Sequence, residues 1–151
     1  MEFMKQEAPL SLRGRMYNRD SARPKEQKIP VLKTAIAGMD HYIESKEEQK
    51  ALRELKPGDE LLPYREPENE KDKWAIAVYR TEDDKIGYIT RFKNETIARL
   101  MDVGKKFVAE VADPENDPEI KEIMDRENQR YRQTWTEDLA LPFVVYMIEE
   151  G

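Results

Sequence analysis

Short runs of apolar and β-branched residues recur along the chain, and within each run they alternate with small or polar positions. Runs of this kind occupy residues 31–38, 59–65, 74–80, 85–91, 106–112 and 141–150. A period of two is typical of β-strands, because successive side chains point to opposite faces of a sheet. The pattern therefore predicts six strands, and the short segment TEDD at 81–84 predicts that two of them form a β-hairpin.

The strand predicted at 74–80 has large and small side chains on opposite faces. Trp74, Ile76 and Val78 share one face, and Ala75, Ala77 and Tyr79 share the other. Small residues opposite large ones suit a strand of a small curved barrel, in which one face is crowded. In the next strand, Gly87 predicts a bulge or a close approach of another backbone segment.

Two short segments show helical spacing of apolar residues instead. Residues 45–55 begin with Ser45, whose hydroxyl can cap a helix. Residues 94–104 begin with Asn94, another capping residue, and end with Gly104, which suits the left-handed position that follows a helix. Both segments are predicted to be short helices with a narrow apolar stripe.

A third helix is predicted inside an acidic insertion at about 113–138. Asp117 as the N-cap, with Pro118 at the first helical position, is a strong start signal. Ile120 and Ile123 belong to a thin apolar edge, so this helix is expected to be mostly exposed. Six short strands, two short helices and one inserted helix predict a mainly β (α+β) fold, in the form of a small closed β-barrel.

The domain organisation follows from where this periodicity starts. Residues 1–30 show no sustained period and contain three prolines. We therefore predict an N-terminal arm over 1–30 and a barrel domain over 31–151 that carries the insertion.

Composition excludes several classes of function. Charged residues make up 38% of the chain, hydrophobic residues another 38%, and the net charge is -6. The absence of cysteine excludes disulfides, thiolate metal ligands and cysteine nucleophiles, and His41 as the only histidine excludes a multi-histidine zinc site. We find no nucleophile with a base and no glycine-rich phosphate loop, so we expect no enzyme, no cofactor and no metal. Without a long apolar run or a signal-peptide core, a cytoplasmic protein is expected.

The charge is unevenly distributed. Residues 1–30 hold seven basic and four acidic side chains, whereas residues 112–138 hold nine acidic and four basic ones. The acidic total argues mildly against nonspecific nucleic-acid binding. The middle of the chain is nearly balanced, so a local basic groove is compatible with the sequence there.

A spaced set of residues in the middle of the chain follows a specific order. It consists of Gly58-Asp59, Arg65-Glu66-Pro67, Asn69, Asp72, Ala75-Ile76, Val78 and Ile86-Gly87-Tyr88. This pattern resembles the HIRAN domain family over roughly residues 31–112, with the last strand near 141–149 closing the domain. The chain is similar to stand-alone bacterial or phage-type members, which are related to the N-terminal domain of helicase-like transcription factor. The resemblance implies an OB-like β-barrel and, as in eukaryotic members, a pocket for the free 3′-hydroxyl end of single-stranded DNA.

The resemblance also implies where the site lies. Where members that hold DNA ends have an Arg-Tyr pair, this chain has Asp40 and His41, followed by Tyr42. Their loop N-P-Y-D corresponds to residues 69–72, in which Lys71 takes the place of the base-stacking tyrosine.

Two further positions complete the correspondence, because Tyr88 stands at the histidine of the family's G-H step and Arg91 at the lysine that follows it. The full set of candidate nucleic-acid-binding residues is Asp40, His41, Tyr42, Arg65, Asn69, Lys71, Asp72, Tyr88, Arg91 and Lys93.

Each group of candidates also has a structural interpretation. Asn69 and Asp72 can hold a turn through nearby backbone amides, can offer polar atoms to a ligand hydroxyl or base edge, or can do both, because a loop fixed by its own side chains is a preorganised site. The aromatic rings at 41, 42 and 88 either pack at the rim of the barrel or stack on bases. The cations at 65, 91 and 93 either lie in solvent or bind phosphates.

The sequence thus predicts a non-catalytic module that binds single-stranded DNA or DNA 3′ ends, in DNA repair or processing or in phage-related metabolism. The alternative is a protein-interaction or assembly module on the same barrel, which the overall acidity, Asp40 and Lys71 favour. Besides DNA, the expected partners are a protein such as a helicase and a second copy of the chain. Self-association is expected through residues 1–30 and the helix at 118–135, and no membrane partner is expected.

Overall fold

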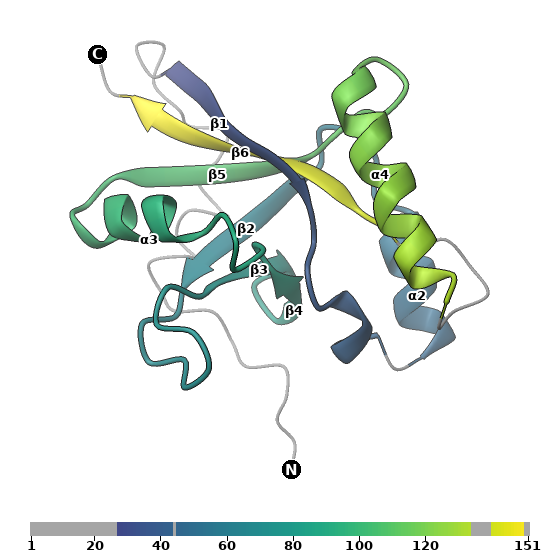
Figure 1. Ribbon diagram of the computed structural model, residues 1–151, viewed down its shortest axis with the longest axis horizontal. Helices are drawn as coiled ribbons and strands as arrows, with labels where there is room; N and C mark the ends of the chain where they lie inside the picture. The colour runs from purple at the N-terminus through teal and green to yellow at the C-terminus, as the bar shows by residue number, and fades with distance from the viewer. Residues whose placement is uncertain (1–26, 44, 134–139, 150–151) are drawn as a thin grey trace.

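The computed structural model describes residues 27–43, 45–133 and 140–149, and shows six antiparallel strands in one sheet with three α-helices (Figure 1). The strands are β1 (Gln27–Ala35), β2 (Glu60–Arg65), β3 (Ile76–Thr81), β4 (Asp84–Tyr88), β5 (Lys106–Val111) and β6 (Pro142–Glu149). The helices are α2 (Lys46–Arg53), α3 (Glu95–Asp102) and α4 (Pro118–Tyr131), with a 3-10 turn η2 (Met39–His41). The predicted six strands, two short helices and inserted helix are confirmed. The strand order is β1-β6-β5-β2-β3-β4, so β1 and β4 form the edges.

The two edges of the sheet meet at one point. Directly after β1, Ala37 pairs with Tyr88 of β4 through two backbone hydrogen bonds, each 2.9 Å long. Within the part of the chain that the structure describes, this bridge alone joins the two edges, and the sheet does not close into a barrel. The mainly β class is therefore confirmed, whereas the OB-like barrel stays a prediction.

The first strand begins earlier than predicted. β1 starts at Gln27, not at residue 31, because almost its whole length pairs with β6 in antiparallel register. Pro30 is tolerated because β1 is an edge strand and its register shifts between Pro30 and Leu32. The predicted boundary at residue 30 thus falls inside a strand, and residues 1–26 of the predicted arm lie outside the described residues.

β3 is buried on both faces. Ile76 and Val78 belong to the main core, whereas Ala77 and Tyr79 belong to a smaller cluster. The predicted alternation is confirmed, since alternate side chains of a strand point to opposite faces. The strand begins at Ile76 and not at Trp74, because the residues just before it form a turn. Trp74 lies partly buried against the main core.

Gly87 brings β4 against the segment that follows β1. A Cβ atom on this residue would overlap Ile36 Cγ2 and lie 2.6 Å from the carbonyl oxygen of Ala37. The register of β3 against β4 also shifts next to Gly87, between Val78 and Tyr79. The bulge and the close approach that Gly87 predicted are both present.

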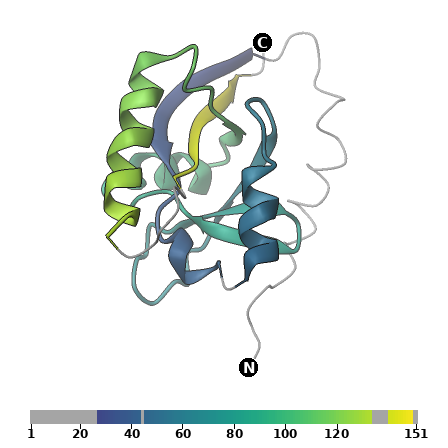
Figure 2. The ribbon, with the colours of Figure 1, turned by 90° about the vertical axis from the view of Figure 1, so that its right-hand side faces the viewer.

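α4 lies beside β1 and β6 (Figure 2). Ile120 and Ile123 are buried in one cluster with Ala35 of β1 and Val144 of β6. The thin apolar edge of α4 therefore faces the sheet, and the helix begins as predicted, since Asp117 accepts a 3.0 Å hydrogen bond from a first-turn backbone N–H.

The two short helices end and begin largely as the sequence predicts. Ser45 Oγ accepts a 3.1 Å hydrogen bond from the backbone N–H of Glu48 at the start of α2. After α3, Gly104 has a φ of +99° and donates to the carbonyl oxygen of Met101 at 3.0 Å, as in a Schellman motif. No helix among the described residues has the length and apolar character needed to cross a membrane.

Candidate nucleic-acid interface

The loop that joins β2 to β3, residues 66–75, is held by its own side chains. Asn69 Oδ1 accepts hydrogen bonds from the backbone N–H groups of Lys71 (2.9 Å) and Asp72 (3.0 Å). The backbone N–H of Asn69 donates to the carbonyl oxygen of Glu66 at 3.2 Å. Asn69 therefore holds the turn, and the loop has a fixed conformation before any ligand arrives.

Asp72 connects this loop to the start of α3. Its Oδ1 accepts a 2.9 Å hydrogen bond from the backbone N–H of Trp74, and its Oδ2 accepts a 2.8 Å bond from Asn94 Nδ2. Asn94 is only 1% exposed and holds the predicted N-cap position, but its side chain makes no capping bond. Asn94 is therefore at the predicted N-cap position, but the predicted capping hydrogen bond is wrong, because the side-chain amide bonds to Asp72 and joins two loops.

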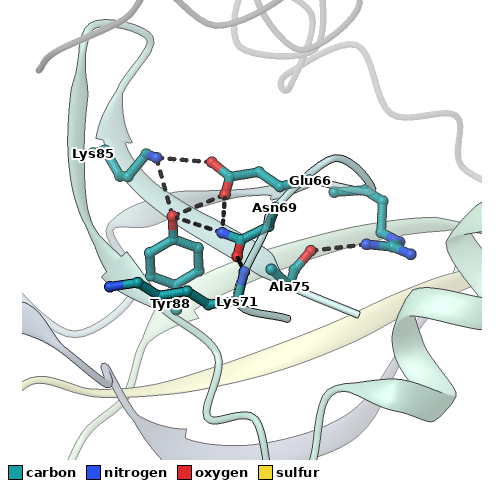
Figure 3. Close-up of polar contacts among 7 residues, drawn as sticks. Glu66, Asn69, Lys71, Ala75, Lys85 and Tyr88 are labelled. Carbon is teal, nitrogen blue, oxygen red and sulfur yellow. Dashed lines mark hydrogen bonds and ion pairs between the residues drawn. The ribbon is translucent and has the colours of Figure 1, made fainter. Parts of the chain in front are cut away.

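Three donors converge on the carboxylate of Glu66 (Figure 3). Tyr88 OH (2.8 Å) and Asn69 Nδ2 (3.1 Å) donate to Oε1, and Lys85 Nζ donates to Oε2 at 2.8 Å. Burial alone would raise the pKa of Glu66, but these donors more than offset it and hold the pKa below its usual value. Burial likewise opposes the charge of Lys85, and Glu66 outweighs it, so the pKa of Lys85 is raised. We call Glu66, Asn69, Lys85 and Tyr88 the Glu66 cluster.

Two tyrosine rings lie next to each other at this cluster. The ring centroids of Tyr42 and Tyr88 are 6.2 Å apart with the planes tilted by 49°, and Lys85 Nζ is 5.2 Å from the Tyr88 centroid. Burial is the main cause that raises the pKa of Tyr88 to about 12 and the pKa of Tyr42 still further. Both hydroxyls are therefore protonated at neutral pH, and both side chains are partly exposed.

Asp40 and His41 lie on η2, away from the contacts of the Glu66 cluster. Both side chains are exposed. The pKa of Tyr131 in α4 is raised to about 12, mainly by burial and then by the charge of Asp40. Asp40 therefore lies toward α4, and of the three predicted residues 40–42 only Tyr42 contacts the cluster.

Arg65 is engaged inside the chain. Its Nε and Nη2 donate to the two carboxylate oxygens of Asp102, at 3.0 and 3.3 Å, and its Nη1 donates to the carbonyl oxygen of Ala75 at 3.1 Å. The Arg65 side chain is only 12% exposed. Arg65 therefore clamps β2 to the end of α3, and its planar donor fork is already occupied.

The other two predicted cations, Arg91 and Lys93, are exposed instead, and so is Lys71, the candidate at the position of the family's stacking tyrosine. The side chains of Lys71, Arg91 and Lys93 form no ion pair with any residue in 27–43, 45–133 or 140–149. Lys71 lies on the 66–75 loop, and the other two lie on the loop between β4 and α3. Because Asp72 and Asn94 join these two loops, the three cations come from neighbouring segments.

Sequence reasoning missed four residues of this region, namely Glu66 and Lys85 of the cluster, the bridging Asn94, and the exposed Phe92. Glu66 was part of the recognised pattern, but nothing local shows that Lys85, 19 positions later, is its partner. Phe92 had a usable signal, because it is an aromatic residue between Arg91 and Lys93.

A loop fixed by its own side chains, exposed cations on neighbouring segments and a pair of tyrosines thus belong to one small β-rich domain. The family model of the HIRAN domain matches residues 29–132, more than half of the chain, so the chain belongs to the HIRAN domain family. HIRAN domains are generally DNA-binding modules and not catalytic ones.

Two solved structures share the fold. A structural-genomics protein from Lactobacillus plantarum has a TM-score of 0.59 and 22% identity, with 83% of this chain and 99% of that chain covered. The HIRAN domain of human HLTF has a TM-score of 0.55 and 14% identity, with 86% of this chain and 84% of that chain covered. No curated protein matches the chain.

Proposed function

We propose that this HIRAN domain binds single-stranded DNA, and DNA 3′ ends in particular, on a two-loop surface made of Lys71, Arg91 and Lys93 beside Tyr42 and Tyr88. One observation carries this proposal: three cations without an ion pair among the described residues lie on loops that the Asp72–Asn94 hydrogen bond holds together. Single-strand binders combine cations that follow the phosphates with aromatic rings on which bases stack. The Tyr42–Tyr88 pair supplies such rings next to the 66–75 loop.

The charge of the surface sets the expected strength of binding. Lys71 has two exposed acidic neighbours on its own loop, Glu68 and Glu70, whereas residues 85–93 contain three basic residues and no acidic one. The whole chain has a net charge of -6, which repels phosphates at long range. Binding is therefore expected to be of modest affinity, local, and strongly dependent on salt.

Asp72 is better placed than Asn69 to bind the hydroxyl of a 3′ end. Asn69 uses its carbonyl oxygen for two backbone N–H groups, and its amide donates to Glu66 and lies 3.5 Å from Tyr88 OH. A carboxylate has about four acceptor sites, and Asp72 uses one on each oxygen. Asp72 can therefore accept a hydrogen bond from a free 3′-hydroxyl, and its charge would repel a 3′-phosphate.

The test is fluorescence anisotropy with labelled single-stranded, blunt double-stranded and 3′-phosphorylated oligonucleotides, at low and at moderate salt. The proposal expects the single strand with a free 3′-hydroxyl to bind most tightly. Absence of binding to all three would remove the proposal, whereas a 3′-phosphate without effect would remove only the recognition of ends. Arg91→Ala should weaken this binding, and Arg126→Ala is its matched control. Arg126 is also exposed, but it lies on α4, which packs beside β1 at the opposite edge of the sheet from β4.

The finer features of the family complete the proposal. The Ala37–Tyr88 bridge supports an OB-like barrel that is open along most of this edge. A module that holds single-stranded ends suits DNA repair or processing, or phage-related metabolism, next to a helicase partner.

A second candidate function is assembly, and the edge strand β1 favours it. Ile29 and Val31 of β1 are 37% and 41% exposed on a strand at the edge of the sheet, where another chain could pair. For self-association, α4 offers less apolar surface than the sequence suggested, because Ile120 and Ile123 are already buried against the sheet. The end of the predicted helix, residues 134–135, lies outside the described residues. Light scattering that shows a monomer at high concentration would count against self-association.

A further inference from the structure

Phe92 is an aromatic ring that the fold leaves in solvent. Its exposure of 82% is the largest among the bulky hydrophobic residues that the structure describes. A single exposed apolar side chain is common on protein surfaces, so its surroundings decide what the exposure means.

The surroundings of Phe92 are cationic and fixed in place. The guanidinium carbon of Arg91 lies 5.4 Å from the ring centroid, and Lys93 follows directly in the chain. The loop is anchored on one side by the backbone hydrogen bond from Ile89 to Ile76 (3.0 Å) and on the other by the buried Asn94. A ring on an anchored turn loses little conformational freedom when a flat ligand stacks on it.

The ring is not part of a larger apolar patch. Val103, the other highly exposed hydrophobic residue in this region at 76%, lies beyond the opposite end of α3. Eight helical residues separate them by about 12 Å along the helix axis. Binding of a protein partner at this position would require a continuous apolar surface. Stacking of a nucleobase requires only one exposed ring face, with cations close enough to reach the phosphates on either side of that base.

We propose that Phe92 is a base-stacking residue of this domain, with Arg91 and Lys93 on the phosphates that flank the stacked base of a single strand. This inference rests on the proposed function and extends the two-loop surface to a position that the family resemblance does not mark. It also supplies an aromatic ring on a chain in which Lys71 stands at the position of the family's stacking tyrosine.

The experiment measures, by fluorescence anisotropy, the affinity of wild type, Phe92→Ala, Phe92→Trp and the control Val103→Ala for two labelled strands. One strand is oligo-dT of about twelve nucleotides, and the other is an abasic strand of the same length and backbone. Loss of one base–aromatic stack should weaken oligo-dT binding roughly 5- to 150-fold in Phe92→Ala. Phe92→Trp and Val103→Ala should bind as wild type does, and the alanine variant should lose nothing on the abasic strand, which offers phosphates but no bases.

The outcomes separate the two proposals. If wild type binds oligo-dT and Phe92→Ala binds it equally well, the stacking role is wrong and the proposed function stands. An equal loss on the abasic strand would also overturn stacking, because it would show that the loop had been disturbed. If wild type binds neither strand, the proposed function fails and this inference fails with it. Thermal melts should be unchanged in all variants, since both substituted side chains are largely exposed.

Discussion

The side-chain amide of Asn94 donates a 2.8 Å hydrogen bond to the Asp72 carboxylate, which lies 22 positions earlier in the chain. Asn94 is 1% exposed, so the donor of this bond is shielded from water, whereas the acceptor Asp72 is partly exposed. It joins the 66–75 loop to the start of α3 and so holds together the two segments that carry Lys71, Arg91 and Lys93. The bond is therefore a condition for a single two-loop surface.

Asn94→Ala should lower the stability of the fold. The substitution removes the buried amide and its hydrogen bond to a charged acceptor, which together cost about 1–3 kcal/mol of unfolding free energy. Urea denaturation followed by circular dichroism measures the effect. Asn116→Ala is the control, because Asn116 is exposed and its loss should change the free energy of unfolding by less than about 0.5 kcal/mol. Equal stability of the two variants would show that the Asp72–Asn94 bond does not hold the loops.

Gly87→Ala should destabilise the junction of the two sheet edges. The new methyl group would overlap Ile36 and lie 2.6 Å from the carbonyl oxygen of Ala37, so the backbone must move. Such overpacking costs roughly 1–3 kcal/mol, and it should open the bridge between Ala37 and Tyr88. Faster hydrogen exchange of these two amides, together with a lower urea midpoint, is the expected result. Unchanged exchange at both amides would mean that the close approach imposes no constraint.

Local patterns were sufficient to predict most of the fold. The six strands and three helices follow from periods of two and 3.6 and from capping residues such as Ser45 and Asp117, whose predicted hydrogen bonds exist. Gly87 was also informative, because a glycine inside a strand has few reasons to be there other than a bulge or a close approach. These features depend on residues that are near each other in the sequence, or on the backbone alone.

The partners of charged and polar side chains could not be predicted, because they depend on how distant segments are arranged. Arg65 was predicted to face a ligand, but Asp102, 37 positions later, occupies its donors. Asn94 was predicted as a cap from its local position, yet a distant carboxylate competes more strongly for its amide. Lys71, Arg91 and Lys93 keep their charged groups exposed, because the fold brings no carboxylate of the described residues within ion-pair distance of them.

Glu66→Gln should reveal the pH range over which the Glu66 cluster stabilises the fold. The pKa of Glu66 is held below 4.5 in the fold, so its contribution is complete above about pH 4.5 and is lost as pH falls through the lower folded value. The pKa of Lys85 is raised above 10.5, so its contribution is complete below that pH and is lost as pH rises through the higher folded value. Between these two pH limits, the free energy of unfolding of the wild type should exceed that of Glu66→Gln by roughly 1–3 kcal/mol.

Urea denaturation of both proteins at pH 3, 5, 7 and 9 measures that difference, which should shrink only at pH 3. Glu95→Gln is the control, because the Glu95–Arg99 pair is exposed and should contribute little at any pH. A wild-type advantage that is independent of pH down to 3 would show that the ionised form of Glu66 is not what stabilises the cluster.

The salt dependence of DNA binding should report how many cations touch phosphates. For a single strand the slope of log K against log salt is about -0.7 per phosphate contact, so Lys71, Arg91 and Lys93 together predict a slope of about -2. Each single alanine substitution should reduce the slope by about 0.7, whereas Arg126→Ala should leave it unchanged. Anisotropy titrations between about 25 and 200 mM salt, an eightfold range, test this expectation. A slope that no substitution changes would place the phosphates elsewhere on the molecule.

Arg65 and Arg91 should respond to substitution in opposite ways. Arg65 donates three hydrogen bonds within the chain, so Arg65→Lys, which cannot reproduce the planar fork, should cost about 1–3 kcal/mol of unfolding free energy. Because three of its five N–H donors are already used within the chain, affinity for oligo-dT should stay within about twofold of wild type once the variant is folded. Arg91→Ala should do the reverse, with stability changed by less than about 0.5 kcal/mol and weaker binding. If Arg65→Lys weakened binding while its stability was unchanged, Arg65 would belong to the interface, and the clamp on Asp102 would have to open when DNA binds.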